Sequence, residues 1–171
     1  MKAVRLHARG GPEALAYEDA SRPEPGDGEV LIQVHATAVT PTEFQWAPTW
    51  TTRSGEARPF PIILGHEFSG VVAEVGPGVT APAKGEAVYG LNDWFRDGAQ
   101  AEYCVARADE VAAKPRSVDH AHAAAVPISA LTAWQGLFDH AHLAAGERIL
   151  VQGAAGGVGL FAVRFARLRV P

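Results

Sequence analysis

The sequence predicts a mostly β chain in which helices are confined to the last third. Short stretches of alternating apolar and polar residues recur up to about residue 114, and glycine and proline separate them. Alanine-rich stretches begin only after residue 117, and one apolar run then leads into a glycine-rich segment. We therefore expect a compact antiparallel, barrel-like β domain, followed by helices and one strand–loop–helix unit.

The β part consists of six expected strands, most of which alternate apolar and polar residues. Turn residues separate them: segment 22–28 holds two prolines and two glycines, which neither a helix nor a central strand tolerates. The expected strands cover residues 2–6, 29–36, 70–76, 85–89, 100–105 and 110–115.

Helices are expected on both sides of one further strand. Ser117 is the expected N-cap of the first helix, and Pro127 breaks the alanine-rich stretch that follows. The apolar run at 148–152 predicts a short strand that is buried on both faces. The expected helices cover residues 117–126, 128–142 and 158–168.

Composition excludes several classes of protein. A chain of 171 residues with 47% hydrophobic residues can bury a sizeable core, and its 20% charged residues disfavour disorder. The net charge of −4 without a basic cluster disfavours nucleic-acid or anionic-membrane binding. The sequence shows no targeting segment and no apolar run of membrane-spanning length, which predicts a soluble cytoplasmic protein. The single cysteine, Cys104, cannot form an intrachain disulfide and is expected to pack as a small hydrophobe.

The most informative motif is the segment Gly153–Gly159, which follows an apolar run and opens a helix. In that position glycines permit a tight turn and a close approach of the backbone to a pyrophosphate, which the helix N-terminus attracts. No Gly-Lys-Ser/Thr follows, so the segment is not a Walker A loop. The alternative is a tight turn that binds nothing. A ribose-binding residue, expected about 20 residues further on, falls beyond Pro171.

Four motifs in this order resemble the medium-chain dehydrogenase/reductase superfamily, specifically its zinc-independent, quinone-reductase-like branch. They are Gly65–Val72, Gly76–Thr80, the segment 124–134 with its Ala-Ala-Val-Pro and Leu-Thr-Ala-Trp elements, and Gly153–Gly159. The resemblance implies a GroES-like β domain followed by a Rossmann domain that binds NADPH or, alternatively, NADH. It divides the chain into a GroES-like domain at 1–116, connecting helices at 117–146, and the start of a truncated Rossmann domain at 147–171, which is its first βα unit.

The zinc-dependent members of the superfamily resemble this chain only in part. Their Gly-His-Glu element is present as residues 65–67, but Thr40 and Ile128 stand where the resemblance expects the cysteine ligands of zinc. The cysteine cluster of a structural zinc site is missing too, so we expect no zinc. A fragment of a zinc-dependent alcohol dehydrogenase remains an alternative. Two His-x-His pairs, 120/122 and 140/142, would point to different sides of a helix and are expected to be solvated.

The resemblance also implies roles for individual residues. Thr40, Thr42 and His66 would act at the substrate carbonyl, although a structural role for His66 is the alternative. Trp46 and Trp94 would form apolar walls of the substrate pocket, unless they pack in the core. The expected cofactor-binding residues are Thr132, Gly153, Ala154, Ala155, Gly156, Gly157, Val158 and Gly159.

The function implied is that of an NAD(P)H-dependent oxidoreductase, which transfers hydride from nicotinamide to a quinone or an α,β-unsaturated carbonyl. NADPH is the expected cofactor because this branch usually uses it. The rival hypothesis is a non-catalytic truncated relative or interaction module, because one strand and one helix cannot bury their own apolar faces. In that case a completing partner chain or a second copy would cover residues such as Leu150 and Leu160.

Overall fold

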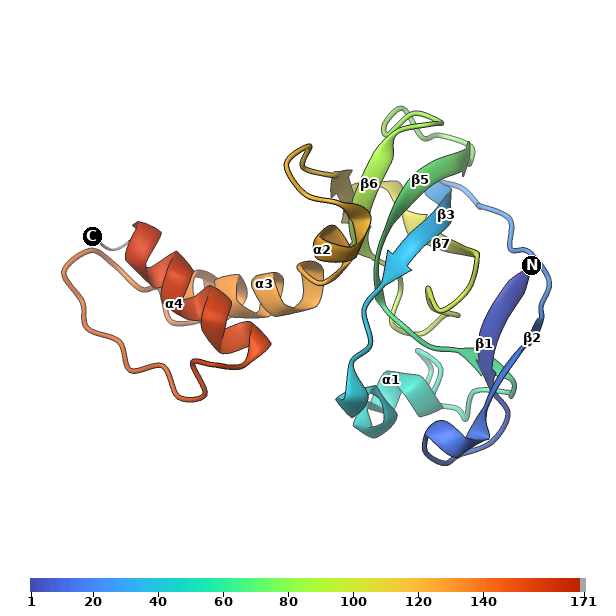
Figure 1. Cartoon of the computed structure of the whole chain (residues 1–171), viewed down its shortest axis with the longest axis horizontal. Helices are drawn as coiled ribbons and strands as arrows, with labels where there is room; N and C mark the ends of the chain where they lie inside the picture. Colours follow the sequence, from blue (N-terminus) through green and yellow to red (C-terminus); the bar gives the residue numbers. More distant parts are fainter. Residues whose placement is uncertain (170–171) are drawn as a thin grey trace. The chain divides into compact units, whose positions relative to one another are not determined.

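The computed structural model of the chain describes residues 1–169. The chain separates into two compact units, Met1–Ala125 and a second one that begins at Val126 (Figure 1). Within the described residues, every strand lies in the first unit. The same residues contain no helix that is both long enough and apolar enough to cross a membrane.

In residues 1–169 the strands form two sheets, and all their pairings are antiparallel. The smaller sheet has the order β2-β1-β4, with β1 Lys2–Leu6, β2 Leu15–Asp19 and β4 Ile62–Ile63. The larger sheet has the order β7-β3-β5-β6-β8. Its strands are β3 Glu29–Thr37, β5 Glu67–Val75, β6 Ala87–Leu91, β7 Tyr103–Arg107 and β8 Val111–Ala113.

Short helices lie between these strands or follow the last of them. They are η1 Pro12–Ala14, η2 Pro41–Gln45, α1 Ala47–Trp50, η3 Ala108–Glu110 and α2 His120–Ala124. Helix α2 packs on the larger sheet, against β3, β5 and β6.

The core of the first unit lies on the larger sheet. Ile32 of β3 and Phe68 and Val72 of β5 are fully buried or nearly so. Strands β3 and β5 pair side by side and approach closely at Gly70. A Cβ on Gly70 would lie only 2.1 Å from the carbonyl oxygen of Gln33. Only glycine fits there, so this close pairing of the two longest strands depends on one residue type.

The second unit is helical. Helix α3, Pro127–Trp134, continues into a π-helical turn, η4 Gln135–His140, and α3 packs against α4, Gly157–Arg169. The buried core of this unit consists of Ala133, Leu137 and Ala162.

The structure confirms most of the predicted elements. Each of the six predicted strands overlaps an observed one, and α4 covers the helix predicted at 158–168. Strands β2 and β4 were not predicted. Helix α3 begins at Pro127 itself, since proline suits the first turn of a helix, where its missing N–H needs no partner.

Two predictions are wrong. Segment 148–152 is not a strand: the structure has no strand between Val126 and Arg169, so this run has no neighbour with which to pair, and Leu150 is 83% exposed. Ser117 is not a helix N-cap. Asp119 caps α2 instead, because its carboxylate accepts the backbone N–H of His122 at 2.8 Å.

Candidate functional site

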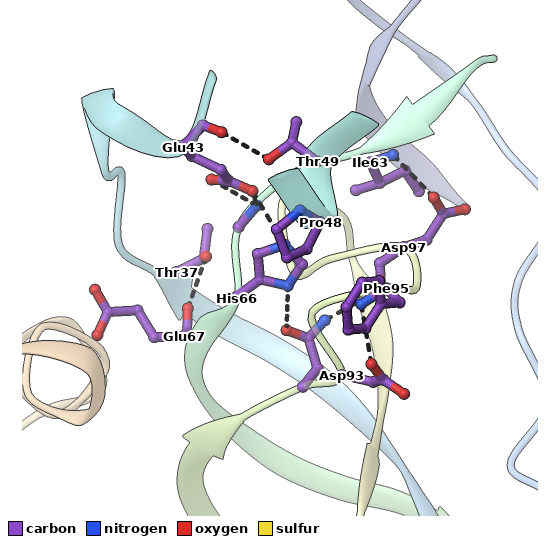
Figure 2. Close-up of polar contacts among 12 residues, drawn as sticks. Thr37, Glu43, Pro48, Thr49, Ile63, His66, Glu67, Asp93, Phe95 and Asp97 are labelled. Carbon is purple, nitrogen blue, oxygen red and sulfur yellow. Dashed lines mark hydrogen bonds and ion pairs between the residues drawn. The ribbon is translucent and has the colours of Figure 1, made fainter. Parts of the chain in front are cut away.

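His66 is the best-positioned of the predicted catalytic residues. It precedes β5 directly and follows Gly65, whose positive φ of 89° sets the chain direction into the strand. The His66 side chain (Figure 2) is 1% exposed. Its Nδ1 lies 3.3 Å from Oδ1 of Asn92. The amide of Asn92 donates to the carbonyl of Asp97, which fixes its orientation and makes Nδ1 of His66 the donor.

Glu43 lies on the other side of His66. Its Oε1 is 3.3 Å from Nε2 of His66, and both carboxylate oxygens accept the backbone N–H of Gly65, at 2.9 and 3.2 Å. Burial lowers the pKa of His66 to about 4, and burial raises the pKa of Glu43, although Gly65 and Arg58 oppose the latter change. His66 is therefore a neutral imidazole at neutral pH.

The two predicted pocket residues form one aromatic cluster with His66, in which Trp94 lies between Trp46 and the histidine. The ring of Trp94 is 5.0 Å from that of His66, and Trp46 meets Trp94 edge-on at 5.3 Å. Arg53 holds the turn that carries Trp94 through two bonds to the Asp93 carboxylate, at 3.0 and 2.9 Å. The sequence thus predicted three residues that the fold brings into one cluster.

Thr40 lies elsewhere, on an apolar cavity of about 750 Å³ in the first unit. The cavity is lined by parts of β1, β2, β3 and η2 and by residues 99–102, and its lining includes Thr40, Glu43 and His35. Thr42 is exposed and, like His66, is not part of this lining. Glu43 is therefore the residue that joins the cavity to His66.

Glu43 and Asn92 were missed in the sequence. An acidic residue three positions after Thr40 is a weak signal, and nothing in the sequence shows that it is 2% exposed. His66 directly precedes β5 and Asn92 directly follows β6. The two side chains therefore meet only because these strands pair in the larger sheet.

The glycine-rich segment has the local geometry that a phosphate-binding turn requires. Gly153 has a positive φ of 67°, and Gly156 N–H donates to its carbonyl at 2.9 Å, which closes the turn at the start of α4. A Cβ on Gly159 would lie 2.3 Å from the Gly153 carbonyl oxygen, so the turn packs directly on the helix. Residues 152–158 are exposed at this N-terminus, where a pyrophosphate can approach.

Thr132 and Val158, both predicted to bind cofactor, line one cavity of about 260 Å³ in the second unit. Residues 149–152, which precede the glycine turn, also line this cavity. The lining does not include the turn residues Gly153–Gly157.

The residues of the chain do not match the donor set of a zinc site. Residues 1–169 contain no group of three or more His, Cys, Asp or Glu side chains placed to hold a metal ion. Cys104 is 2% exposed in the core, and burial raises the pKa of its thiol, which disfavours the thiolate that zinc binds. We derive no chemistry through zinc, and zinc independence stays a prediction.

The His-x-His pairs differ from one another. His140 and His142 are exposed, as expected, and so is His122. The prediction is wrong for His120, which is half-buried, stacks on His35 and bonds to Ser69. Its helix packs on a sheet, which the sequence pattern of the helix alone does not show.

Several known proteins that are similar to this chain are named oxidoreductases. The alcohol dehydrogenase GroES-like domain family matches residues 26–116. The quinone oxidoreductases of Pongo abelii and Homo sapiens are each 38% identical to this chain over 171 residues, covering 98% of this chain and 50% of theirs. The chain thus spans about half the length of the curated relatives it matches.

Solved structures agree with this fold. The quinone oxidoreductase from Coxiella burnetii superposes with a TM-score of 0.87 at 29% identity, covering 99% of this chain and 54% of that one. An alcohol dehydrogenase superfamily protein from Novosphingobium aromaticivorans gives 0.86 at 31%, covering 99% and 51%. The expected fold class, a GroES-like β domain followed by part of a Rossmann domain, is confirmed. The chain belongs to the alcohol dehydrogenase GroES-like family, within the quinone-oxidoreductase-like branch of the medium-chain dehydrogenase/reductase superfamily.

Proposed function

We propose that the protein is an NAD(P)H-dependent oxidoreductase that reduces a quinone or an α,β-unsaturated carbonyl compound. The observation that carries the proposal is the glycine turn at the start of α4, in a chain whose relatives are named quinone oxidoreductases. The proposal includes the domain division at 116 and 146, a cytoplasmic location and independence from zinc.

The proposed cofactor is NADPH, with NADH as the alternative. A mycobacterial protein solved in complex with NADPH is 34% identical to this chain and superposes with a TM-score of 0.81, covering 98% of this chain and 50% of that one. The turn 153–159 would hold the pyrophosphate through free backbone N–H groups, and Thr132 would contact the nicotinamide. The cofactor supplies the hydride when it is bound.

The first unit would orient the substrate carbonyl. Thr40 lines the apolar cavity, and its side chain makes no capping hydrogen bond at the start of η2, so the hydroxyl can donate to a substrate oxygen. The apolar wall of the cavity lowers the local dielectric constant, which strengthens that hydrogen bond. His66 is a neutral ring with Nδ1 committed to Asn92, which favours a supporting role over direct contact with substrate.

The rival, a non-catalytic interaction module, is favoured by the exposed apolar residues of the second unit. Ile149, Leu150 and Leu168 are 43%, 83% and 78% exposed. A test of cofactor binding distinguishes the two hypotheses. The enzyme must bind the cofactor at the glycine turn, whereas an interaction module needs no phosphate-binding turn.

Titration of the 171-residue chain with NADPH, followed by cofactor fluorescence and by melting temperature, tests the proposal. The informative variant is Gly156→Asp. A Cβ at this position meets its nearest neighbour at 3.4 Å, so the side chain fits, and a carboxylate at the N-terminus of α4 stabilises the helix. The same charge repels a pyrophosphate, so we expect the Kd for NADPH to rise at least about tenfold while folding is kept.

The matched control is Gln135→Glu, which adds the same charge at an exposed position of η4, outside the glycine turn, and should leave the Kd unchanged. If millimolar NADPH and NADH both leave fluorescence and melting temperature of the wild type unchanged, the enzyme hypothesis for this chain is wrong. The assignment to the family would be untouched by that result.

A further inference from the structure

Helix α2 is attached to the sheet through His120, which the sequence pattern predicts to be solvated. Ala123 and Ala124 are each 1% exposed, and the first residue of the helix, His120, makes the polar contacts. Its ring stacks on that of His35 of β3, with centroids 4.5 Å apart and planes at 27°. Its Nδ1 lies 2.8 Å from the hydroxyl of Ser69 in β5.

The hydrogen bonds define which nitrogen of His120 carries the proton. The hydroxyl of Ser69 donates to the carbonyl of Val88 at 2.9 Å, and a hydroxyl has only one hydrogen to give. Ser69 must therefore accept from Nδ1–H of His120. The neutral ring satisfies this contact fully, and further protonation takes place at Nε2 without loss of the Ser69 bond.

A proton on Nε2 would add positive charge at an unfavourable place. His35 faces the ring from β3, and Lys114 faces it from the segment that follows β8. The carboxylate of Asp119, on the helix side, favours the charged form but is already bonded to the backbone and ring of His122, at 2.8 and 2.7 Å. From β6, Tyr89 stands opposite Ser69 in the ladder and adds no cationic or carboxylate group.

We propose that the stacked pair His35–His120 is a pH-sensitive contact that holds α2 on the sheet at neutral pH and releases it in mild acid. Burial, His35 and Lys114 together lower the pKa of His120 from its ordinary 6.5. The His120 ring therefore takes up a proton at a higher pH when α2 is released than when it is packed on the sheet. The attachment of α2 is at full strength above about pH 6.5 and weakens as the pH falls.

The contact also touches the candidate site. His35 lines the cavity of about 750 Å³ that contains Thr40, so release of α2 frees the His35 ring at the wall of that cavity. This consequence for catalysis rests on the proposed function. The attachment itself does not, and it is tested without cofactor.

Hydrogen exchange by NMR on the whole chain measures the attachment, using the Ala123 amide, which donates to the carbonyl of Asp119 at 3.0 Å. After correction for the intrinsic exchange rate, its protection should fall between pH 7.5 and pH 5.5, by up to about tenfold per pH unit for one proton. The decisive variant is His120→Asn, whose amide nitrogen replaces Nδ1 as donor to Ser69 but cannot be charged. It should abolish this fall, whereas His122→Asn, at an exposed position of the same helix, should retain it.

Direct titration of His120 by ¹H–¹⁵N NMR provides a second measurement that does not depend on any variant folding. The expected result is an Nδ1–H tautomer at pH 7.5 and a midpoint below 6.5. An Nε2–H tautomer, a midpoint at or above 6.5, equal protection of Ala123 at both pH values, or an equal fall in His120→Asn would each overturn the proposal.

Discussion

Thr40 and Thr42 stand two residues apart, yet the structure gives their hydroxyl groups different surroundings. Thr40 is half-buried on the apolar cavity, whereas Thr42 is exposed and outside its lining. Under the proposed function, Thr40→Val should lower kcat/KM for a quinone by about tenfold, the worth of one hydrogen bond, and Thr40→Ser should retain activity. Thr42→Val is the matched control, and a loss there equal to that of Thr40→Val would contradict this assignment of roles.

His66 should make the stability of the first unit depend on pH. Its pKa is lowered to about 4 in the folded chain, from 6.5 in the unfolded one, so only the unfolded chain takes up this proton between those values. The contribution is complete above pH 6.5 and falls by about 3 kcal/mol as the pH drops to 4. The raised pKa of Glu43 acts in the opposite direction.

Urea unfolding of the wild type and of His66→Gln at pH 7 and pH 4.5 isolates the histidine, because Glu43 is present in both proteins. The free energy of unfolding should fall more steeply with acid in the wild type. Equal slopes would mean that His66 takes up its proton in the folded chain as readily as in the unfolded one.

At the scale of elements, the residue pattern predicts those strands whose alternation is strong and misses those formed by pairing alone. Strand β2 forms because β1 lies beside it, with Leu6 opposite Leu15, and its own sequence is half polar. Segment 148–152 is the converse case, since its apolar residues favour a strand but no described neighbour supplies a ladder. Ser117 and Asp119 are both suitable N-cap residues, and the sequence alone does not show at which of them the helix begins. In the structure Asp119 caps α2.

The glycine turn before α4 gives a prediction at this scale. Gly159→Ala would place a Cβ 2.3 Å from the Gly153 carbonyl oxygen, which the backbone must relieve by moving. We expect a loss of about 1–3 kcal/mol in the stability of the second unit, measured by thermal unfolding. Gly156→Ala, where the nearest atom is 3.4 Å away, is the control and should leave the melting temperature within error. Equal effects would mean that the turn does not pack on α4 as described.

At the scale of the whole molecule, the sequence predicted the order of the parts and the cluster of His66, Trp46 and Trp94. It could not predict Glu43 and Asn92, because the burial of a polar side chain depends on the packing of segments distant in sequence. The sequence groups Thr40, Thr42 and His66 as one set of catalytic residues, whereas the structure places Thr40 in the lining of a cavity that His66 does not line.

Exposure along the chain predicts where a protease cuts first. Residues 144–150 and 152–156 are exposed and irregular up to the start of α4, with Leu150 83% exposed. Limited digestion with thermolysin, which cuts before large apolar residues, should therefore cleave near Leu150 and leave the first unit intact, as mass spectrometry of the fragments would show. Leu150→Asp should slow that cut, and an equally early cut within residues 1–125 would contradict the described exposure.

Cys104 lies in β7 opposite Ile32 of β3, 2% exposed, and it is the one cysteine among the 171 residues. Burial also raises the pKa of its thiol, so the folded chain offers a thiol reagent neither access nor thiolate. A coloured reagent added to the native protein therefore reacts only as fast as these two strands separate. The reaction rate of this native cysteine therefore reports how fast β3 and β7 of the larger sheet separate, and no engineered label is needed.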